Sequence, residues 1–313
     1  MSDPAGEATY VPLSELQTID TVSLLPQGSQ WECEPCATRF VLSARSPDCP
    51  YCALPLSECA GDESQPMFRP EGLLPFKVPF GEASESFQGW IKDQAGLMTP
   101  SDLVETAKPD RLVGVYLPHF LFRCQTTTDY AVVSVTKGGT SDRPTWHESG
   151  PHTGTIESAF VDLMVCANTA LPAELVEALE PWDLDALQAY ETDLAGEYTI
   201  ESRGNHAALL EVGKERMKRT IESSIHGKVG GDYLDVRKLE VECKETKVRS
   251  FLFPLWIVSY RYKEQVYRVL VNARTGEVSG DHPTTGLKLF LLLLGAVALI
   301  GGIIVTVILL VRP

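Results

Sequence analysis

Four cysteines in two close pairs carry the strongest chemical signal in this chain. Cys33 and Cys36 form one CxxC pair, and Cys49 and Cys52 form a second pair after twelve intervening residues. Each pair predicts a knuckle that presents two thiolates to one ion, and two knuckles on a β-hairpin complete a tetrahedral shell of four sulfurs. Such a shell suits Zn²⁺, with iron in a rubredoxin-like site as the alternative. Because four cysteines leave no open coordination position, the predicted metal is structural.

The predicted zinc ribbon spans residues 29–59 and has a strand at Phe40–Leu42 between the two pairs. A module of this size has too little core to fold unaided, so the metal is expected to contribute the missing free energy. Ala37 and Ala53 follow the two pairs, where a knuckle usually prefers glycine, so mild backbone strain is expected. Cys59 is interpreted as a buried thiol, with a spare metal ligand as the alternative.

Motifs for common catalytic chemistry are missing from the sequence. There is no GxxxxGK[ST] phosphate loop, no GxSxG nucleophile elbow and no HExxH metal helix. His147 and His152 form a local histidine pair with Trp146 in a Gly- and Pro-containing stretch. A polar loop is the default interpretation of Trp146–His152, and an active site or a second metal site is the alternative. No catalytic residue is predicted, and the chain is not expected to be an enzyme.

An α+β domain with antiparallel sheets is predicted over residues 73–286, after a flexible tail (1–28), the ribbon and a linker (60–72). Breaker residues predict a turn at Lys137–Gly139 and a loop over 140–154, whereas 156–168 fits either a helix or a strand. Periodicity predicts helices over 84–94, 101–107, 172–179 and 205–226, and strands over 112–122, 130–136, 233–244, 248–262, 265–272 and 277–279.

Two apolar segments share a proline-centred pattern. Tyr116–Phe122 and Leu252–Val258 align when Pro118 is placed on Pro254, and each is followed by a tyrosine-led strand. Proline is expected at a strand start or a bulge, because it cannot donate to a ladder. Two β-hairpins built on one plan would explain the pattern, and chance similarity of apolar strands is the alternative.

Charge is divided unevenly along a chain whose formal net charge is −15. Residues 1–202 hold 31 acidic and 10 basic side chains, whereas residues 203–274 hold 9 acidic and 15 basic ones. The basic part is interpreted either as a surface for an anionic leaflet or as a solvated helix face. Because the ribbon and its half of the chain are acidic, they repel phosphate, so a protein partner is expected in preference to nucleic acid.

The stretch Leu289–Val311 contains 23 residues without a charge. A helix crosses a bilayer core with about 20 apolar residues, so a transmembrane helix is predicted over 287–311. Small residues recur every four positions at Ala298, Gly302 and Thr306. This face predicts a homo-oligomer through the anchor helix, with a plain tether as the alternative.

The expected cellular location of the protein follows from the same predicted anchor. The N-terminal residues lack the basic and apolar regions of a secretory signal, and the scattered cysteines favour a reducing compartment. The expected protein is therefore tail-anchored in the inner membrane as a single-pass protein, with its N-terminal part in the cytosol.

Short sequence blocks outside the cysteine pairs carry a family resemblance. They are Leu74–Phe76, Phe87–Ile91, Gly114–Pro118, Pro181–Leu184, Tyr190, Leu194–Gly196, Phe253–Trp256 and Tyr267–Val278. With the cysteine pairs they resemble a group of uncharacterised bacterial proteins, often labelled TFIIB-type zinc-ribbon proteins or relatives of the primosomal replication-restart helicase. The missing phosphate loop excludes that helicase activity here. The resemblance implies a fold, a zinc site and, in some members, a membrane segment, and it implies no activity.

The expected architecture is α+β, with a small N-terminal zinc ribbon, an antiparallel-sheet α+β domain and a C-terminal transmembrane helix. The expected function is a membrane-tethered interaction or scaffold protein that contacts membrane lipid and a protein partner. A membrane-held nucleic-acid-binding protein and an enzyme with a site near Trp146–His152 are the alternatives.

Overall fold

The computed structural model describes residues 11–12, 18–19, 29–42, 48–58, 67–95, 99–140, 143–166, 168, 170–190, 199–202, 206–263 and 265–284. These residues form a mixed α+β structure in which twelve strands join one sheet and two others pair separately. The strands are β1 Val11–Pro12, β2 Thr18–Ile19, β3 Ser29–Cys33, β4 Thr38–Leu42, β5 Ser57–Glu58, β6 Met67–Phe68, β7 Gly72–Leu73, β8 Pro109–Thr140, β9 Arg143–Cys166, β10 Gln188–Ala189, β11 Thr199–Ser202, β12 Tyr233–Tyr262, β13 Gln265–Asn272 and β14 Val278–Gly280. The helices are α2 Phe80–Gln94, α3 Leu103–Thr106, α4 Ala173–Glu177, the 3₁₀ turn η2 Leu184–Ala186, and α6 His206–Val229.

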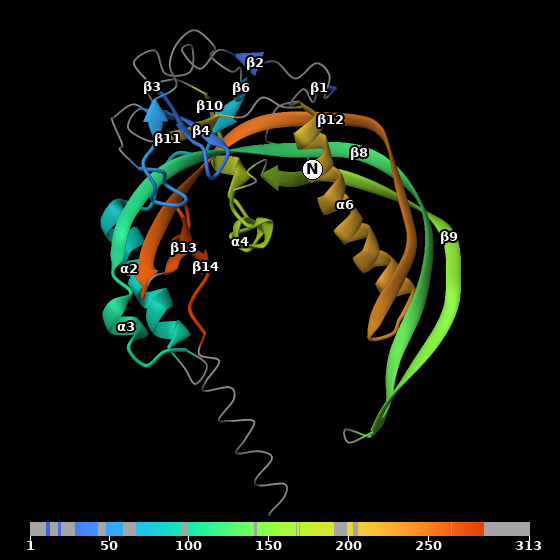
Figure 1. Cartoon of the computed structure of the whole chain (residues 1–313). Helices are drawn as coiled ribbons and strands as arrows, with labels where there is room; N and C mark the ends of the chain where they lie inside the picture. Colours follow the sequence, from blue (N-terminus) through green and yellow to red (C-terminus); the bar gives the residue numbers. More distant parts are fainter. Residues whose placement is uncertain are drawn as a thin grey trace, which may run out of the picture.

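Three long antiparallel strands form the frame of the molecule. β8 lies between β9 and β12 and pairs with both along most of its length. Register shifts interrupt both ladders, and such bulges bend a strand and increase its twist. The three strands accordingly curve into an arch (Figure 1).

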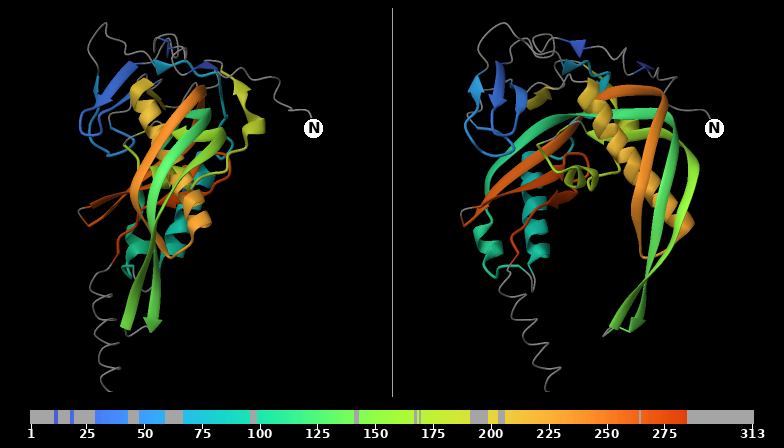
Figure 2. Two further views of the ribbon diagram at one scale, coloured as in Figure 1. Left: turned by 90° about the vertical axis from the view of Figure 1, so that its right-hand side faces the viewer. Right: turned by 45° about the vertical axis from the view of Figure 1, so that its right-hand side comes forward.

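Helix α6 lies on the concave side of this arch (Figure 2). It buries Leu209, Met217, Ile221 and Ile225, which recur at helical spacing, against aromatic and aliphatic side chains of β8, β9 and β12. Gly213 makes the close approach of helix and sheet achievable, because a Cβ atom there would lie 3.1 Å from the Phe122 ring.

A second helix covers the other end of the arch. α2 buries Ala83, Phe87 and Ile91 against Tyr260 and its neighbours in β12 and β13. The helix predicted over 84–94 is confirmed, although it begins four residues earlier, at Phe80. The molecule therefore has a separate helix-on-sheet core at each end of the same long strands.

Pro118 and Pro254 lie inside the two central strands, and the segments around them pair with each other. The first of the two predicted hairpins was wrong, because Tyr116–Phe122 and the tyrosine-led segment after it belong to the single strand β8. The second is confirmed, since β12 and β13 form an antiparallel pair. On its other side β8 pairs with β11 before Pro118 and with β9 after it, and β12 pairs with β7 before Pro254 and with β13 after it. The ladder bond that each proline cannot donate is thus lost where the strand changes neighbours.

Several local predictions differ from the structure. The loop predicted over 140–154 is strand from Arg143 onward, and the turn predicted at Lys137–Gly139 lies within β8. The segment 156–168 is strand up to Cys166. β1 and β2 lie in the stretch predicted as a flexible tail over 1–28, and β6 and the first residue of β7 lie in the predicted linker over 60–72.

No helix among the described residues is long and apolar enough to cross a bilayer. The anchor predicted over 287–311, with Ala298, Gly302 and Thr306, lies outside the described residues, as does Cys59.

Candidate metal centre

The four predicted ligands come together at one end of a small antiparallel sheet. β3 and β4 form a hairpin, and β5 pairs with β3 on its other side. Cys33 ends β3, and Cys36 lies in the turn that leads into β4. Cys49 and Cys52 lie in a second turn, closed by a bridge between Asp48 and Pro55. Two knuckles from separate turns therefore face each other, as the spacing predicts.

The sulfur positions match a single-ion site. All four Sγ atoms lie within 4.8 Å of one another. Cys33 Sγ lies 3.5 Å from Cys52 Sγ, and Cys49 Sγ lies 4.0 Å from Cys36 Sγ. Four sulfurs at about 2.3 Å from a central ion would lie about 3.8 Å apart in a tetrahedron. The described residues thus hold a four-cysteine cluster that could bind a metal ion such as zinc.

The knuckle backbones have the strain that the sequence predicts. Ala37 and Ala53 have φ angles of 48° and 58°, in the left-handed region that favours glycine. The Ala37 and Ala53 N–H groups donate to the carbonyls of Glu34 and Cys49, at 3.1 Å and 3.0 Å. Backbone N–H groups of the turns also point toward sulfur, as where Tyr51 N–H donates to Cys49 Sγ at 3.3 Å.

Without a cation, the cluster favours protonated thiols at two positions. Burial raises the pKa of the Cys49 thiol to about 12, and burial together with the neighbouring thiols raises that of Cys36. Burial also acts to raise the pKa of Cys52, but hydrogen bonds from the Leu54 backbone and the other thiols lower it. A bound divalent ion reverses this preference, because its charge stabilises all four thiolates.

The ribbon shares a core with the main sheet. Tyr51 is fully buried beside Phe40, with ring centroids 5.3 Å apart, and its hydroxyl accepts a hydrogen bond from Asn168 at 2.8 Å. Trp31, Phe40, Tyr51 and Leu56 belong to the same buried cluster as side chains of β8 and β12. β11 joins the two parts, pairing with β4 on one side and β8 on the other.

The alternative site at Trp146–His152 lies on an exposed part of β9. His147 is opposite Thr136, and His152 is opposite Val132. Four pairs along a strand correspond to about 14 Å, too far for two imidazoles to share one ion. Their nearest side-chain partners are Thr145 and Ser149 hydroxyls, at 3.1 Å and 3.4 Å. The structure therefore does not bring these histidines together.

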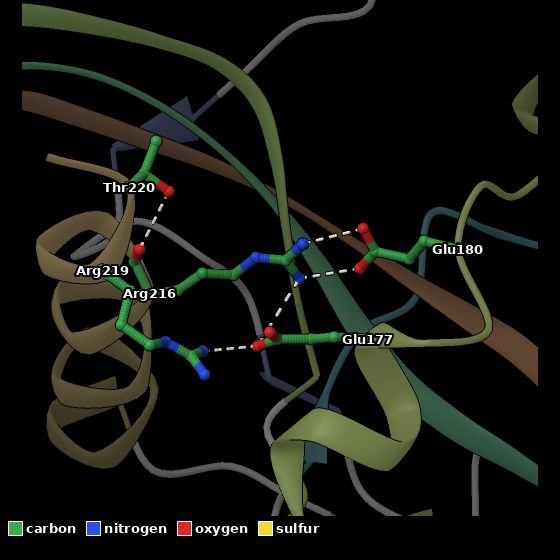
Figure 3. A network of polar contacts seen from close by, with 5 residues as sticks. All are labelled: Glu177, Glu180, Arg216, Arg219 and Thr220. Carbon is green, nitrogen blue, oxygen red and sulfur yellow. Dashed lines mark hydrogen bonds and ion pairs between the residues drawn. The ribbon is translucent and has the colours of Figure 1, made fainter. Parts of the chain in front are cut away.

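A second polar cluster has no counterpart in the sequence prediction. Arg216 of α6 reaches across to Glu180 and donates two hydrogen bonds of 2.7 Å to its carboxylate (Figure 3). Arg219, three positions farther along α6, donates to Glu177 of α4. Burial disfavours the charge of Arg216, but its bonds to Glu180 raise its pKa above the ordinary value. The four side chains balance in charge and fix α4 to α6.

This ion-pair cluster lies between an open cleft and a buried histidine. The cleft has a volume of about 510 Å³ and is lined by β9 residues 158–164, by Glu180–Trp182 and by one face of α6. His119, which is 1% exposed, stacks on Phe253 and lies beside Arg216 at a smaller cavity of about 20 Å³. Because the Leu117 carbonyl can only accept, His119 Nδ1 donates to it at 3.1 Å, which leaves Nε2 as a bare acceptor.

Sequence spacing had no means to reveal this cluster. Glu180 and Arg216 are 36 positions apart and lie in different elements. The only available signal was the run of alternating charges on the helix at 211–219, which is also typical of a solvated face.

Comparison with known proteins gives one distant relative. The chain is 25% identical over 226 residues to the uncharacterised protein YdjG of Bacillus subtilis (strain 168). The match covers 68% of this chain and 64% of that protein, so the chain spans less than two thirds of its relative's length. No protein-family model matches the chain, and no solved structure matches it. The chain is thus distantly homologous to an uncharacterised bacterial protein and carries a four-cysteine cluster consistent with a zinc ribbon.

Proposed function

We propose that this chain is a membrane-tethered zinc-ribbon protein whose folded part faces the cytosol and binds a protein partner. The observation that carries the proposal is the convergence of Cys33, Cys36, Cys49 and Cys52 from two turns at one end of a small sheet that shares the main core. A closed four-sulfur shell supplies structure rather than chemistry, because no coordination position remains for a substrate.

Zn²⁺ is the proposed ion and its proposed role is structural. Four thiolates in a tetrahedron match the shell that Zn²⁺ prefers, and the resemblance to TFIIB-type zinc-ribbon proteins supports the same assignment. The ion would hold the two turns of the ribbon together. It would thereby fix Tyr51, which carries the packing of the ribbon onto the main sheet.

The tether is proposed from the uncharged stretch Leu289–Val311. A protein partner is favoured over nucleic acid by the 31 acidic against 10 basic residues in the first 202 positions. The basic helix α6 gives little support to a phosphate surface, because Lys214, Arg216, Lys218 and Arg219 all form ion pairs with glutamates.

Metal analysis tests the zinc assignment directly. Freshly purified protein is expected to contain about one Zn²⁺ per chain by mass spectrometry of the metal. The double variant Cys36→Ser/Cys52→Ser is expected to lose it, because two of four ligands are removed. Cys166→Ser is the matched control and should retain the metal. Wild-type protein with no zinc, or with iron in its place, would overturn the assignment.

Affinity capture from a mild-detergent extract tests the interaction. The wild-type chain is expected to retain a protein in fixed ratio, and the zinc-free double variant to lose it. Eluates are stained for nucleic acid at two salt concentrations. Recovery of nucleic acid that disappears at high salt would favour the nucleic-acid-binding alternative instead.

A further inference from the structure

Three sulfur atoms meet in the core beneath α6, far from the ribbon in the sequence. Cys124 of β8 lies with its Sγ atom 3.6 Å from Met217 Sδ, and Cys243 of β12 lies with its Sγ atom 3.9 Å from the same Sδ. Met217 is fully buried, Cys124 is 3% exposed and Cys243 is half-buried. The cluster therefore joins three of the elements that build this end of the arch, β8, α6 and β12.

The spacing of these sulfurs suits a three-coordinate ion. Three sulfurs at about 2.3 Å from a central ion would lie about 4.0 Å apart in a trigonal plane. The two measured separations are 3.6 Å and 3.9 Å. Small adjustments of unbranched Cys and Met side chains would complete the geometry, and Met is flexible enough to make them.

The pairing of the strands disfavours a disulfide between the two thiols. Cys243 is opposite Thr126, two positions along β8 from Cys124. Such diagonal neighbours are usually about 7–8 Å apart, whereas disulfide-bonded Cα atoms lie about 4.4–6.8 Å apart. Both cysteines are free thiols in the structure. The arrangement thus holds two separate thiols against a thioether.

The ligand set selects the kind of ion. Thiolate and thioether sulfurs are soft ligands, which select Cu(I), whereas Mg²⁺ and Ca²⁺ require oxygen. Zn²⁺ normally takes four ligands, and the four-cysteine ribbon supplies a better site for it. We propose that Cys124, Cys243 and Met217 form a second metal site in this protein, which binds one Cu(I) ion.

Charge and access are consistent with this site. Binding would release the two thiol protons to solvent and leave a Cu(I)–dithiolate unit with one negative charge. Hydrogen bonding to Cys124 and the positive charge of Lys214, one turn before Met217 on α6, lower the pKa of the Cys243 thiol, whereas burial and the negative charge of Glu211 act to raise it. Because Cys243 is the half-buried member, it is the point of entry for the ion.

An anaerobic Cu(I) titration of the zinc-loaded full chain in detergent tests the proposal. A chromophoric Cu(I) chelator reports binding, and a zinc indicator in the same cuvette reports displacement of zinc from the ribbon. One Cu(I) per chain is expected to bind without zinc release. Cys124→Ser and Cys243→Ser are each expected to weaken it at least about 100-fold, since loss even of outer-shell partners costs about 10–100-fold.

Met217→Leu separates metal binding from packing. This substitution conserves volume and is tolerated in most cores, so the fold should persist while Cu(I) affinity falls about tenfold. Cys166→Ser is the matched control and should leave the titration unchanged. Copper bound only as zinc is released, or equal affinities in wild type, Cys243→Ser and Met217→Leu, would overturn the site. Because zinc is measured separately, the assignment of zinc to the ribbon is tested independently of the copper site.

Discussion

At the scale of single residues, His119 is the buried titratable group with the clearest consequence. Burial lowers the pKa of His119 from 6.5 to about 4, and the positive charge of Arg216 acts in the same direction. The hydrogen bond to the Leu117 carbonyl acts to raise the pKa. The folded protein therefore binds fewer protons here than the unfolded chain between those pH values. Its contribution to stability is complete above pH 6.5 and is lost as the pH falls toward 4.

We expect the free energy of unfolding to fall by up to about 3 kcal/mol more in wild type than in His119→Phe between pH 7 and pH 4. Phenylalanine keeps the stack on Phe253 and removes the titration. Denaturant unfolding at several pH values gives the slope of the free energy of unfolding against pH for each of the two proteins. His147→Phe, at an exposed position of β9, is the control, and equal slopes for wild type and His119→Phe would contradict the prediction.

Arg216 provides a second test at this scale. Its side chain is 18% exposed and pairs with Glu180 and Glu177, so Arg216→Met removes the partner of Glu180, whereas Glu177 keeps Arg219. We expect the free energy of unfolding to fall by about 2–3 kcal/mol. Lys218→Met, on the same helix but 39% exposed, should change stability by less than about 0.5 kcal/mol. A similar loss of stability in both variants would contradict the prediction, because it would come from the substitution in the helix and not from the broken ion pair.

At the scale of elements, α6 is fixed to the sheet through its glycine. A side chain at Gly213 would meet the Phe122 ring at 3.1 Å, whereas one at Gly227 would meet nothing within 4 Å. We therefore expect Gly213→Leu to lower the free energy of unfolding by about 1–3 kcal/mol, because the core is overpacked. Gly227→Leu should raise it by about 0.5 kcal/mol through helix propensity. Thermal denaturation measures the stability of both variants. If Gly213→Leu is more stable than the wild type, the prediction is contradicted, because α6 must then move away from Phe122 to make room for the new side chain.

Elements with strong local patterns were predictable from the sequence. The helix over 205–226 is α6, and the strand over 265–272 is β13, because their periodicity is regular and their ends carry breakers. The strands of the arch were divided or missed where their sequence is polar. The stretch 123–129, with three threonines, reads as a connection, yet it is the middle of β8 because β9 and β12 satisfy its backbone.

The same distinction applies to the sites. The four ribbon cysteines were predictable, since each CxxC pair is local and fixes its own knuckle. Cys124 and Met217 are 93 positions apart, and Glu180 and Arg216 are 36 apart. Neither pair has a short motif, because the topology of the sheet alone brings them together.

At the scale of the whole molecule, the tether remains a prediction with a direct test. Removal of residues 287–313 is expected to move the protein from the membrane fraction to the soluble fraction, because the 23 uncharged residues are lost. Fractionation and immunoblotting of both forms provide the measurement. In spheroplasts, added protease should leave the ribbon of the full chain intact. Digestion of the ribbon from outside would reverse the proposed orientation.

The pairing of β8 with β12 also determines when the protein can fold during its synthesis. Every pair in that ladder joins residues roughly 100–150 positions apart, whereas β8 and β9 are consecutive. At about 5–20 residues per second, a ribosome needs several seconds or more to deliver β12 after β8 has emerged. The β8–β9 hairpin therefore forms first, and the edge of β8 that pairs with β12 stays unpaired until β12 arrives. A nascent chain that ends before Tyr233 keeps that strand edge exposed, which makes it a substrate for chaperones and a source of aggregates.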